Sequence, residues 1–353
     1  MKKLFFIAAI ASAALVSCTK NELAPSVTEQ QEIAFAAPVV GPQTKAVLGA
    51  IDAQYDKGES FDVWSIWHEA ELSAGAWAGT PYITNVAASY DGGVNGWRLA
   101  TPYYWPATGF LSFVALSPSI ANTTSYAEGT GFQISEWSQG ATEAAIVDLM
   151  YSNATLNKKH SQFTYDSELD DDDDSGNFKY NGVDIQFNHA LSYLVFQVKT
   201  VGDYSPTQFR LNAITLSGIY TTGNFTQNPT APATNWAVDE DDEKIGTYKA
   251  YTAGTLSFTS TAVPVPETDK KEIILLPQTL TASQQTITVD YEISTDGTNW
   301  ISQTKSADIV NGTVSAWEMG KKYTYTISIG VDEIIFDPAV STWTNADGGT
   351  ITF

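Results

Sequence analysis

Phe61-Asp62-Val63-Trp64-Ser65-Ile66-Trp67 alternates apolar and polar residues in the way that is typical of a half-buried antiparallel strand. Similar strand patterns recur at residues 110–116, 194–198, 214–219, 286–293 and 323–329. Asp296-Gly297 and Asp347-Gly348-Gly349 supply turn residues that tolerate positive φ. No long segment has helical periodicity, and only short helical turns near residues 141–150 fit the pattern. The sequence therefore predicts an all-β chain of antiparallel β-sandwiches rather than a parallel α/β sheet.

The length of 353 residues suggests two domains, at roughly 150 residues per domain. Glu168–Asp174 is almost entirely acidic, the next three residues break regular structure, and a new apolar pattern starts near Val183. A run of like charge repels itself and stays solvated, which suits a loop between domains. We therefore predict an N-terminal domain over residues 32–178 and a C-terminal domain over residues 179–353. Asp239–Lys244 is expected to form a second acidic loop.

The first residues are typical of an export signal. Lys2 and Lys3 precede the apolar run Leu4–Val16, which is shorter than the ~20 residues that span a bilayer. Leu15-Val16-Ser17-Cys18 resembles the lipobox of bacterial lipoproteins, and Cys18 is the only cysteine in the chain. The pattern predicts a signal peptide over residues 1–17, lipid attachment at Cys18, and a flexible tether over residues 18–31. The alternative is that Cys18 is an incidental small residue.

The chain is strongly acidic, with 40 Asp and Glu residues against 18 Lys and Arg residues and a net charge of −22. Only two of the basic residues are arginines, Arg98 and Arg210. Nucleic-acid binding requires a basic surface that releases counterions from phosphates, so no nucleic-acid partner is expected. An acidic surface keeps an exported protein soluble, and that explanation is sufficient.

The sequence carries no recognisable catalytic motif. His68, His160 and His189 are scattered, and the phosphate-binding loop, nucleophile-elbow and zinc-helix signatures do not occur. We predict no enzymatic activity, no cofactor and no metal site. The run Asp170–Asp174 leaves calcium binding open, but it lacks the ligand spacing and bidentate Glu of a tight calcium loop. A solvated loop is therefore the preferred interpretation of that run.

Ten tryptophans and seventeen tyrosines raise the alternative of a surface glycan-binding lipoprotein, because aromatic faces stack on sugar rings. Tyr103-Tyr104-Trp105 and the pair Trp64 and Trp67 are candidate platforms. Aromatic residues mainly fill the cores of β-sandwiches, so core packing is preferred for most of them. The pattern alone does not rank which tryptophans are exposed.

Short motifs follow one another in a distinctive order along nearly the whole mature chain. They are Glu32–Pro38 followed by Thr44–Val47, Phe61-Asp62-Val63-Trp64, Tyr103-Tyr104-Trp105-Pro106 followed by Leu111–Ala115, Asp148-Leu149-Met150-Tyr151, Phe187–Ser192, Leu275-Leu276-Pro277-Gln278, and Trp317–Tyr325 followed by Asp337–Val340 and Trp343. Each motif alone is short and weak, so the resemblance rests on the order in which the motifs occur. Together they resemble the fimbrillin family of lipoprotein-derived pilins from Gram-negative gut and oral anaerobes.

This resemblance implies two transthyretin-like antiparallel β-sandwich domains in tandem and a lipidated precursor that reaches the outer membrane and its surface. It further implies removal of the first strand by a protease, insertion of an extended segment from another pilin subunit, and release into extracellular fimbriae. Adhesion to a host or bacterial surface ligand fits the same family.

In this chain Lys45 and Ala46 match the processing site, and Asp337–Phe353 is the candidate donor segment. The family's site carries an arginine, whereas no arginine precedes Arg98 here, so a lysine-accepting protease is expected. An uncleaved anchor or tip subunit is the alternative.

Overall fold

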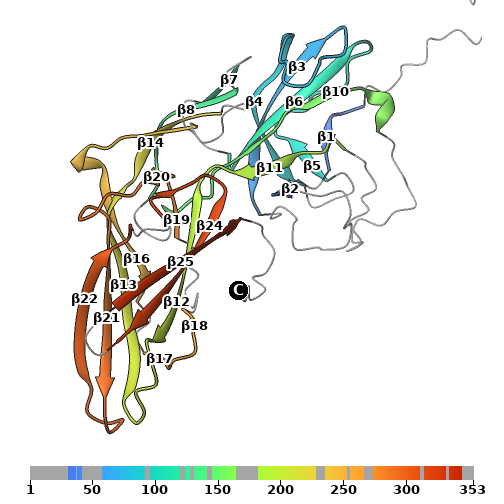
Figure 1. Ribbon diagram of the computed structural model, residues 1–353. Coiled ribbons are helices and arrows are strands. Elements are labelled where there is room, and N and C mark those ends of the chain that lie inside the picture. Colours follow the sequence, from blue (N-terminus) through green and yellow to red (C-terminus); the bar gives the residue numbers. More distant parts are fainter. Residues whose placement is uncertain are drawn as a thin grey trace, which may run out of the picture.

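The structure is a computed structural model that consists almost entirely of β-strands and their connections (Figure 1). It describes residues 31–36, 38–41, 58–91, 96–119, 124–127, 131–140, 145–163, 182–227, 235–252, 255–265, 273–310, 314–330 and 334–343, without the side chains of residues 242 and 334–338. Short 3-10 turns at His160–Gln162 and Asp242–Lys244 interrupt the strands. No helix in these ranges is long and apolar enough to cross a membrane. The all-β prediction is confirmed.

One sheet forms the lobe at the upper right of Figure 1, which we call the N-lobe. Its strands, among the described residues, are β1 (Ala34–Phe35), β2 (Val39–Val40), β3 (Ser60–His68), β4 (Thr80–Tyr90), β5 (Trp97–Leu99), β6 (Phe110–Ser117), β9 (Met150–Ser152), β10 (Thr155–Lys158) and β11 (Gln186–His189). They lie in the order β1-β5-β4-β3-β6-β9-β11-β2, with β10 beside β6. All of these pairings are antiparallel except the one between β11 and β2.

The lobe at the lower left of Figure 1, the C-lobe, contains two sheets. The first has the order β18-β12-β24-β25 with β19 beside β12; its strands are β12 (Ser192–Thr200), β18 (Val263–Pro264), β19 (Ile273–Leu275), β24 (Lys321–Ile329) and β25 (Ile334–Thr342). The second has the order β16-β13-β21-β22 with β17 beside β13; its strands are β13 (Gln208–Tyr220), β16 (Ile245–Tyr251), β17 (Leu256–Phe258), β21 (Thr286–Ser294) and β22 (Ile301–Asp308). Phe196, Leu211 and Tyr325 from these sheets share one buried core, as expected of a β-sandwich.

Between the lobes lies a small sheet that combines strands from distant parts of the chain, which we call the bridging sheet. Its order is β15-β14-β8-β7, built from β7 (Thr124–Ala127), β8 (Gly131–Ser138), β14 (Thr222–Thr226) and β15 (Trp236–Val238). A two-stranded ribbon of β20 (Gln278–Thr279) and β23 (Ala316–Trp317) accompanies it. The bridging sheet covers a core that both halves of the sequence supply, the junction core, which includes Phe132, Phe225 and Trp343.

The strand β3 is buried on both faces. Phe61 and Val63 face the N-lobe core, whereas Trp64 and Ile66 face the junction core. The expectation of a half-buried strand at residues 61–67 was therefore wrong, because the outer face of the N-lobe sheet is covered rather than solvated. Local alternation does not reveal a second layer that comes from elsewhere in the chain.

The predicted boundary between residues 178 and 179 does not coincide with a break in hydrogen bonding. Strand β11 follows the boundary yet pairs with β9, and β14 follows it yet pairs with β8. The division into two tandem domains stays a prediction, with the refinement that β11, β14 and β15 associate with strands that precede the boundary.

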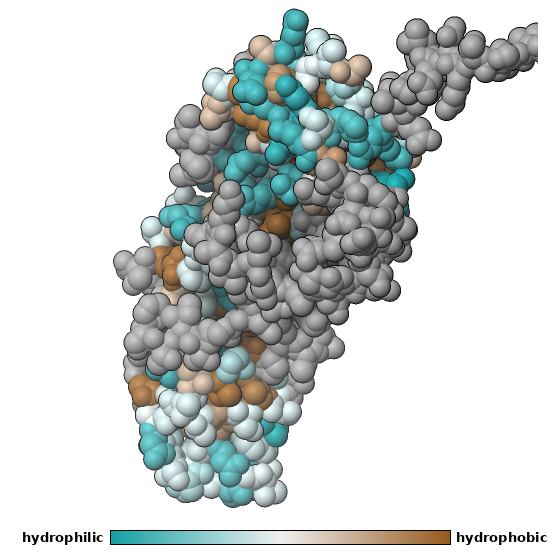
Figure 2. Space-filling model, turned by 90° about the vertical axis from the view of Figure 1, so that its right-hand side faces the viewer, coloured by the Kyte–Doolittle hydropathy of each residue, from teal (hydrophilic) through white to brown (hydrophobic). Residues whose placement is uncertain are grey.

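Figure 2 shows hydrophilic residues gathered over the N-lobe at the top of the molecule. Large apolar side chains that are exposed occur singly in the described ranges: Tyr104, Val201, Ile245, Ile301 and Val340. Isolated exposed apolar residues of this kind are common on the surfaces of folded proteins.

Candidate functional site

One segment supplies both end strands of the N-lobe sheet. Residues 31–36 and 38–41, the first-strand segment, contain β1 at one end of the sheet order and β2 at the other. The segment therefore lies between β5 and β11 and closes the sheet on itself (Figure 1). Its neighbours in space are far from it in sequence, so the closure depends on non-local pairing.

On the β5 side the segment runs antiparallel to its neighbours. Ala34 pairs with Arg98 and Phe35 pairs with Trp97. The Ile33 amide donates to the Tyr103 carbonyl at 2.7 Å. Backbone hydrogen bonds of this kind stabilise the fold mainly because leaving the same groups buried and unpaired would be costly.

On the β11 side the segment runs parallel to its neighbours. The Ala36 amide donates to the Val183 carbonyl at 3.1 Å, and the Val183 amide donates to the Ala34 carbonyl at 3.0 Å. Further along, the Gly41 amide donates to the Phe187 carbonyl at 2.9 Å. The segment is therefore held by main-chain hydrogen bonds along both of its edges.

Apolar side chains of the segment fill the N-lobe core. Ile33 and Phe35 are fully buried, and Val40 is almost so. The Phe35 ring packs edge-on against Phe61 at 5.7 Å and against Phe113 at 5.8 Å between centroids. Burying three such side chains contributes roughly 5–9 kcal/mol by the usual transfer scale. The segment is thus part of the core rather than a cover over it.

The close approach of the segment to its neighbours requires a glycine. A Cβ at Gly182 would lie 2.6 Å from the carbonyl carbon of Phe35 and 2.7 Å from the amide nitrogen of Ala36. Both contacts are with backbone, which cannot move aside without shifting the segment. The N-lobe accepts the first-strand segment at this distance because residue 182 lacks a side chain.

An ion pair marks the start of the segment. Arg98 Nη1 lies 3.0 Å from Glu32 Oε2, and Arg98 Nε lies 3.1 Å from Asp91 Oδ2. All three side chains are between about a quarter and a third exposed, 24–32%. Partly exposed ion pairs of this kind contribute up to about 1 kcal/mol. Burial, not charge, holds the segment in place.

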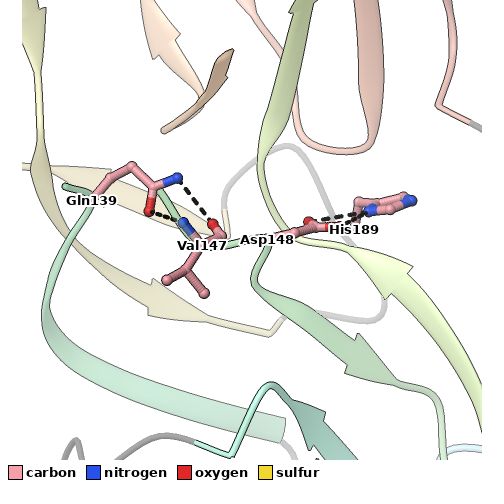
Figure 3. Close-up of polar contacts among 4 residues, drawn as sticks. All are labelled: Gln139, Val147, Asp148 and His189. Carbon is pink, nitrogen blue, oxygen red and sulfur yellow. Dashed lines mark hydrogen bonds and ion pairs between the residues drawn. The ribbon is translucent and has the colours of Figure 1, made fainter. Parts of the chain in front are cut away.

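Strand β11 also carries a buried polar contact at His189, two residues beyond Phe187, the last residue of β11 that bonds to the first-strand segment. His189 Nδ1 lies 2.8 Å from Asp148 Oδ2, and Figure 3 shows the His189 side chain at the end of β11 pointing at the Asp148 side chain, which lies two residues before β9. The His189 side chain is 2% exposed, and its Nε2 has no hydrogen-bond partner in the described part of the chain. Burial raises the pKa of Asp148, although the charge and hydrogen bond of His189 act in the opposite direction.

The tryptophan directly after β25 covers this histidine. The rings of His189 and Trp343 are stacked, and Tyr193 stacks on the same indole at 5.1 Å. The Trp343 amide donates to the Gly320 carbonyl at 3.1 Å. A Cβ at Gly41 would lie 3.9 Å from the Trp343 carbonyl oxygen, so the end of the first-strand segment meets the end of β25.

A glutamine ties this region to the C-lobe. Figure 3 shows the Gln139 amide bonded to the backbone of Val147, directly before Asp148. The same Nε2 donates to the Ile274 carbonyl at 2.7 Å, and Gln139 is 2% exposed. Fully satisfied buried amides rigidify their surroundings. The junction between the lobes is thus fixed by directional contacts as well as by apolar packing.

Several residues predicted to be functional lie outside the described residues. These are Cys18, Lys45, Ala46 and the run Asp170–Asp174, together with the end of the donor segment after Trp343. Their roles stay predictions. The earlier part of the donor segment, Asp337–Thr342, lies in β25 and pairs with β24.

The histidines and aromatic platforms can be placed. His68 Nε2 lies 2.8 Å from the Ser112 hydroxyl oxygen, His189 is paired with Asp148, and His160 lies in an exposed turn. No group of three or more His, Cys, Asp or Glu that could hold a metal occurs in the described ranges. Trp64 and Trp105 are 6% and 4% exposed, which confirms core packing for both.

The sequence matches the model of the fimbrillin-like family over residues 44–343. No curated protein matches it. Among solved structures, a fimbrial protein from Bacteroides vulgatus is 15% identical, with a TM-score of 0.57, 89% of this chain and 99% of that chain covered.

Two candidate cell adhesion proteins also align with this chain. The one from Bacteroides uniformis is 18% identical, covers 89% of this chain and 99% of its own, and has a TM-score of 0.49. The one from Bacteroides ovatus is 12% identical, covers 90% and 99%, and has a TM-score of 0.49. The likeness to the first structure, at 0.57, shows a shared fold.

Proposed function

This chain belongs to the fimbrillin-like family, and from that membership we propose that it is a structural or adhesive fimbrial subunit that exchanges its first-strand segment for an extended segment of a neighbouring subunit. The family resemblance drawn from the motifs is confirmed by the match over residues 44–343. The exchange itself is a proposal that rests on the geometry of the first-strand segment.

The observation that carries the proposal is the position of this segment between β5 and β11. Loss of the segment would leave two strands without a partner on one side and would uncover the sites of Ile33 and Phe35. An unpaired strand edge next to an apolar groove is a template for another strand. A neighbouring subunit that supplies such a strand restores both the hydrogen bonds and the burial.

Export and anchoring complete the proposal. A lipid on Cys18 would hold the precursor on the outer membrane, with residues 18–31 as the tether. Cleavage after Lys45 would separate the first-strand segment from the rest of the chain and release the subunit from its anchor. The donor is then a C-terminal segment within Asp337–Phe353 of another subunit, with β25 either leaving β24 or donating only the residues after Trp343.

The test is controlled cleavage between the first-strand segment and β3. A specific protease site replaces residues 43–48 of the purified chain, and a second version carries a scrambled site. Cleavage should yield SDS-resistant ladders only in the first version, and removal of residues 344–353 should abolish them if that part is the donor. A cleaved subunit that loses the segment and stays monomeric would contradict strand exchange.

A native experiment tests the processing site separately. Mass spectrometry of the mature chain on cells should find Ala46 as the first residue, and Lys45→Ala should block that product. A mature chain that still begins at Cys18 would favour the uncleaved anchor or tip role.

A further inference from the structure

A cleft of about 610 Å³ lies between the bridging sheet and the β20–β23 ribbon. Trp236 and Val238 of β15, with Glu240 just beyond, line one side, and Thr279, Glu318 and Met319 line the other. None of the residues that line the cleft belongs to the first-strand segment. Its volume is within the range of ligand-binding pockets, ~300–1,000 Å³.

Trp236 is the aromatic residue of β15 that lines this cleft. Its indole Nε1 donates to the Ala190 carbonyl at 2.6 Å, which anchors one edge of the ring. Phe225 lies 5.3 Å away at an interplanar angle of 52°, so this neighbour does not cover the indole by face-to-face stacking. Trp236 is only half-buried, unlike Trp64 and Trp105, which are enclosed in the cores.

Charged side chains dominate the polar lining of the cleft, and two of them are carboxylates that accept hydrogen bonds. Glu240 and Glu318 are exposed carboxylates, and Lys321 is a half-exposed donor. The amide of Gln278 also lines the cleft, but its side chain is already bonded to the backbone of Tyr220. Hydrogen bonding to a ligand therefore falls to the two carboxylates, the lysine and the exposed hydroxyl of Thr279.

We propose that this cleft binds a neutral oligosaccharide, with Trp236 stacked on the apolar face of a sugar ring. A sugar ring has one face of C–H groups, which suits an aromatic surface, and hydroxyls at its rim, which donate to carboxylates. A pocket that combines apolar surface with a few convergent polar groups orients such a ligand.

The charge around the cleft disfavours acidic sugars. Asp239, Glu240 and Asp241 follow β15 directly, and Glu318 stands on the opposite side against the single cation Lys321 among the lining residues. This excess of negative charge repels sulfated, sialylated and uronic-acid glycans. The inference goes beyond the proposed fimbrial role and does not depend on strand exchange.

The experiment uses a printed array of neutral and anionic glycans probed with the fluorescently labelled, purified chain, followed by titration of the best neutral glycan. Trp236→Ala should weaken binding by roughly tenfold or more, as truncation of a central aromatic contact commonly does. Glu240→Gln and Glu318→Gln, at exposed positions that leave the fold intact, should each weaken binding severalfold. Trp300→Ala is the matched control, because this tryptophan stacks on Arg210 away from the cleft, and it should bind like the wild type.

Three results would overturn the assignment. The first is an array in which no neutral glycan binds. The second is binding that the two glutamate variants and Trp236→Ala leave unchanged. The third is a preference for anionic glycans, which would place the site on a different surface. Circular dichroism of Trp236→Ala distinguishes lost binding from lost folding, and the glutamate variants decide the question if that variant unfolds.

Discussion

The imidazole of His189 and the indole of Trp343 lie face to face, with ring centroids 3.6 Å apart and an interplanar angle of 4°. The histidine belongs to β11, which holds the first-strand segment, and the tryptophan directly follows β25. One stack therefore joins the strand that holds the first-strand segment to the residue that follows β25.

Removal of the Trp343 ring should destabilise the whole fold. Trp343 is 5% exposed and belongs to the junction core, so Trp343→Ala should lower the free energy of unfolding by about 3–5 kcal/mol. Trp343→Phe keeps an aromatic ring over His189 and should lose markedly less. Urea denaturation of the three proteins measures the difference. If both variants lose the same free energy of unfolding, an aromatic ring over His189 does not stabilise the fold.

The pH dependence of stability should change when Asp148 loses its ability to ionise. Burial raises the pKa of this carboxyl above its ordinary value of 3.8, so the folded protein holds the proton more tightly than the unfolded chain does. That stabilisation is present below pH 3.8 and is lost as the pH rises through the raised pKa. The stability of Asp148→Asn relative to wild type should therefore rise with pH in that window.

Urea denaturation at a series of pH values measures this difference. Asp184→Asn, at an exposed carboxylate, is the matched control and should show no comparable trend. A difference between Asp148→Asn and wild type that stays constant with pH would contradict the effect of burial on Asp148.

A side chain at residue 182 should loosen the first-strand segment without unfolding the C-lobe. The added Cβ of Gly182→Ala meets the backbone of Phe35 and Ala36, and relief of such contacts typically costs about 1–3 kcal/mol. Hydrogen exchange at the amides of Ala36 and Val183 should become faster. Gly202→Ala is the control, because a Cβ there meets nothing within 4 Å. Unchanged protection at both amides would mean that the segment tolerates the added atom.

Lipid attachment should depend on the single sulfur of the chain. Cys18→Ala should abolish metabolic fatty-acid labelling and leave a precursor that no longer partitions with membranes. Ser17→Ala keeps a small residue before the cysteine and should be labelled normally. Labelling of Cys18→Ala at the wild-type level would refute lipidation at this site.

Local features of the fold are predictable from the sequence. The strand patterns at residues 194–198, 214–219, 286–293 and 323–329 all fall within strands of the C-lobe. Asp296-Gly297 forms the predicted turn, with Gly297 at φ 71° and the Asp296 carboxylate accepting from the Thr298 and Asn299 amides. These features depend on neighbouring residues, and so the local pattern is sufficient.

The candidate site is predictable only in part. The apolar character of residues 32–39 identifies a strand, but its partners Trp97 and Val183 are distant in sequence. The sequence also gives no sign that Asp148, His189 and Trp343 meet, since each comes from a different part of the chain. The motif Phe187–Ser192 contains His189, but it does not indicate that His189 contacts Asp148 and Trp343. Side-chain contacts across separate strands require the three-dimensional arrangement.

The first-strand segment runs antiparallel to β5 on one side and parallel to β11 on the other. The two kinds of pairing have different hydrogen-bond geometries. A foreign strand that reproduces both pairings must enter in the same chain direction as the native segment. Subunits joined in this way would all point the same way along a filament, so the two tips of the filament would differ chemically and growth at each would be a separate reaction.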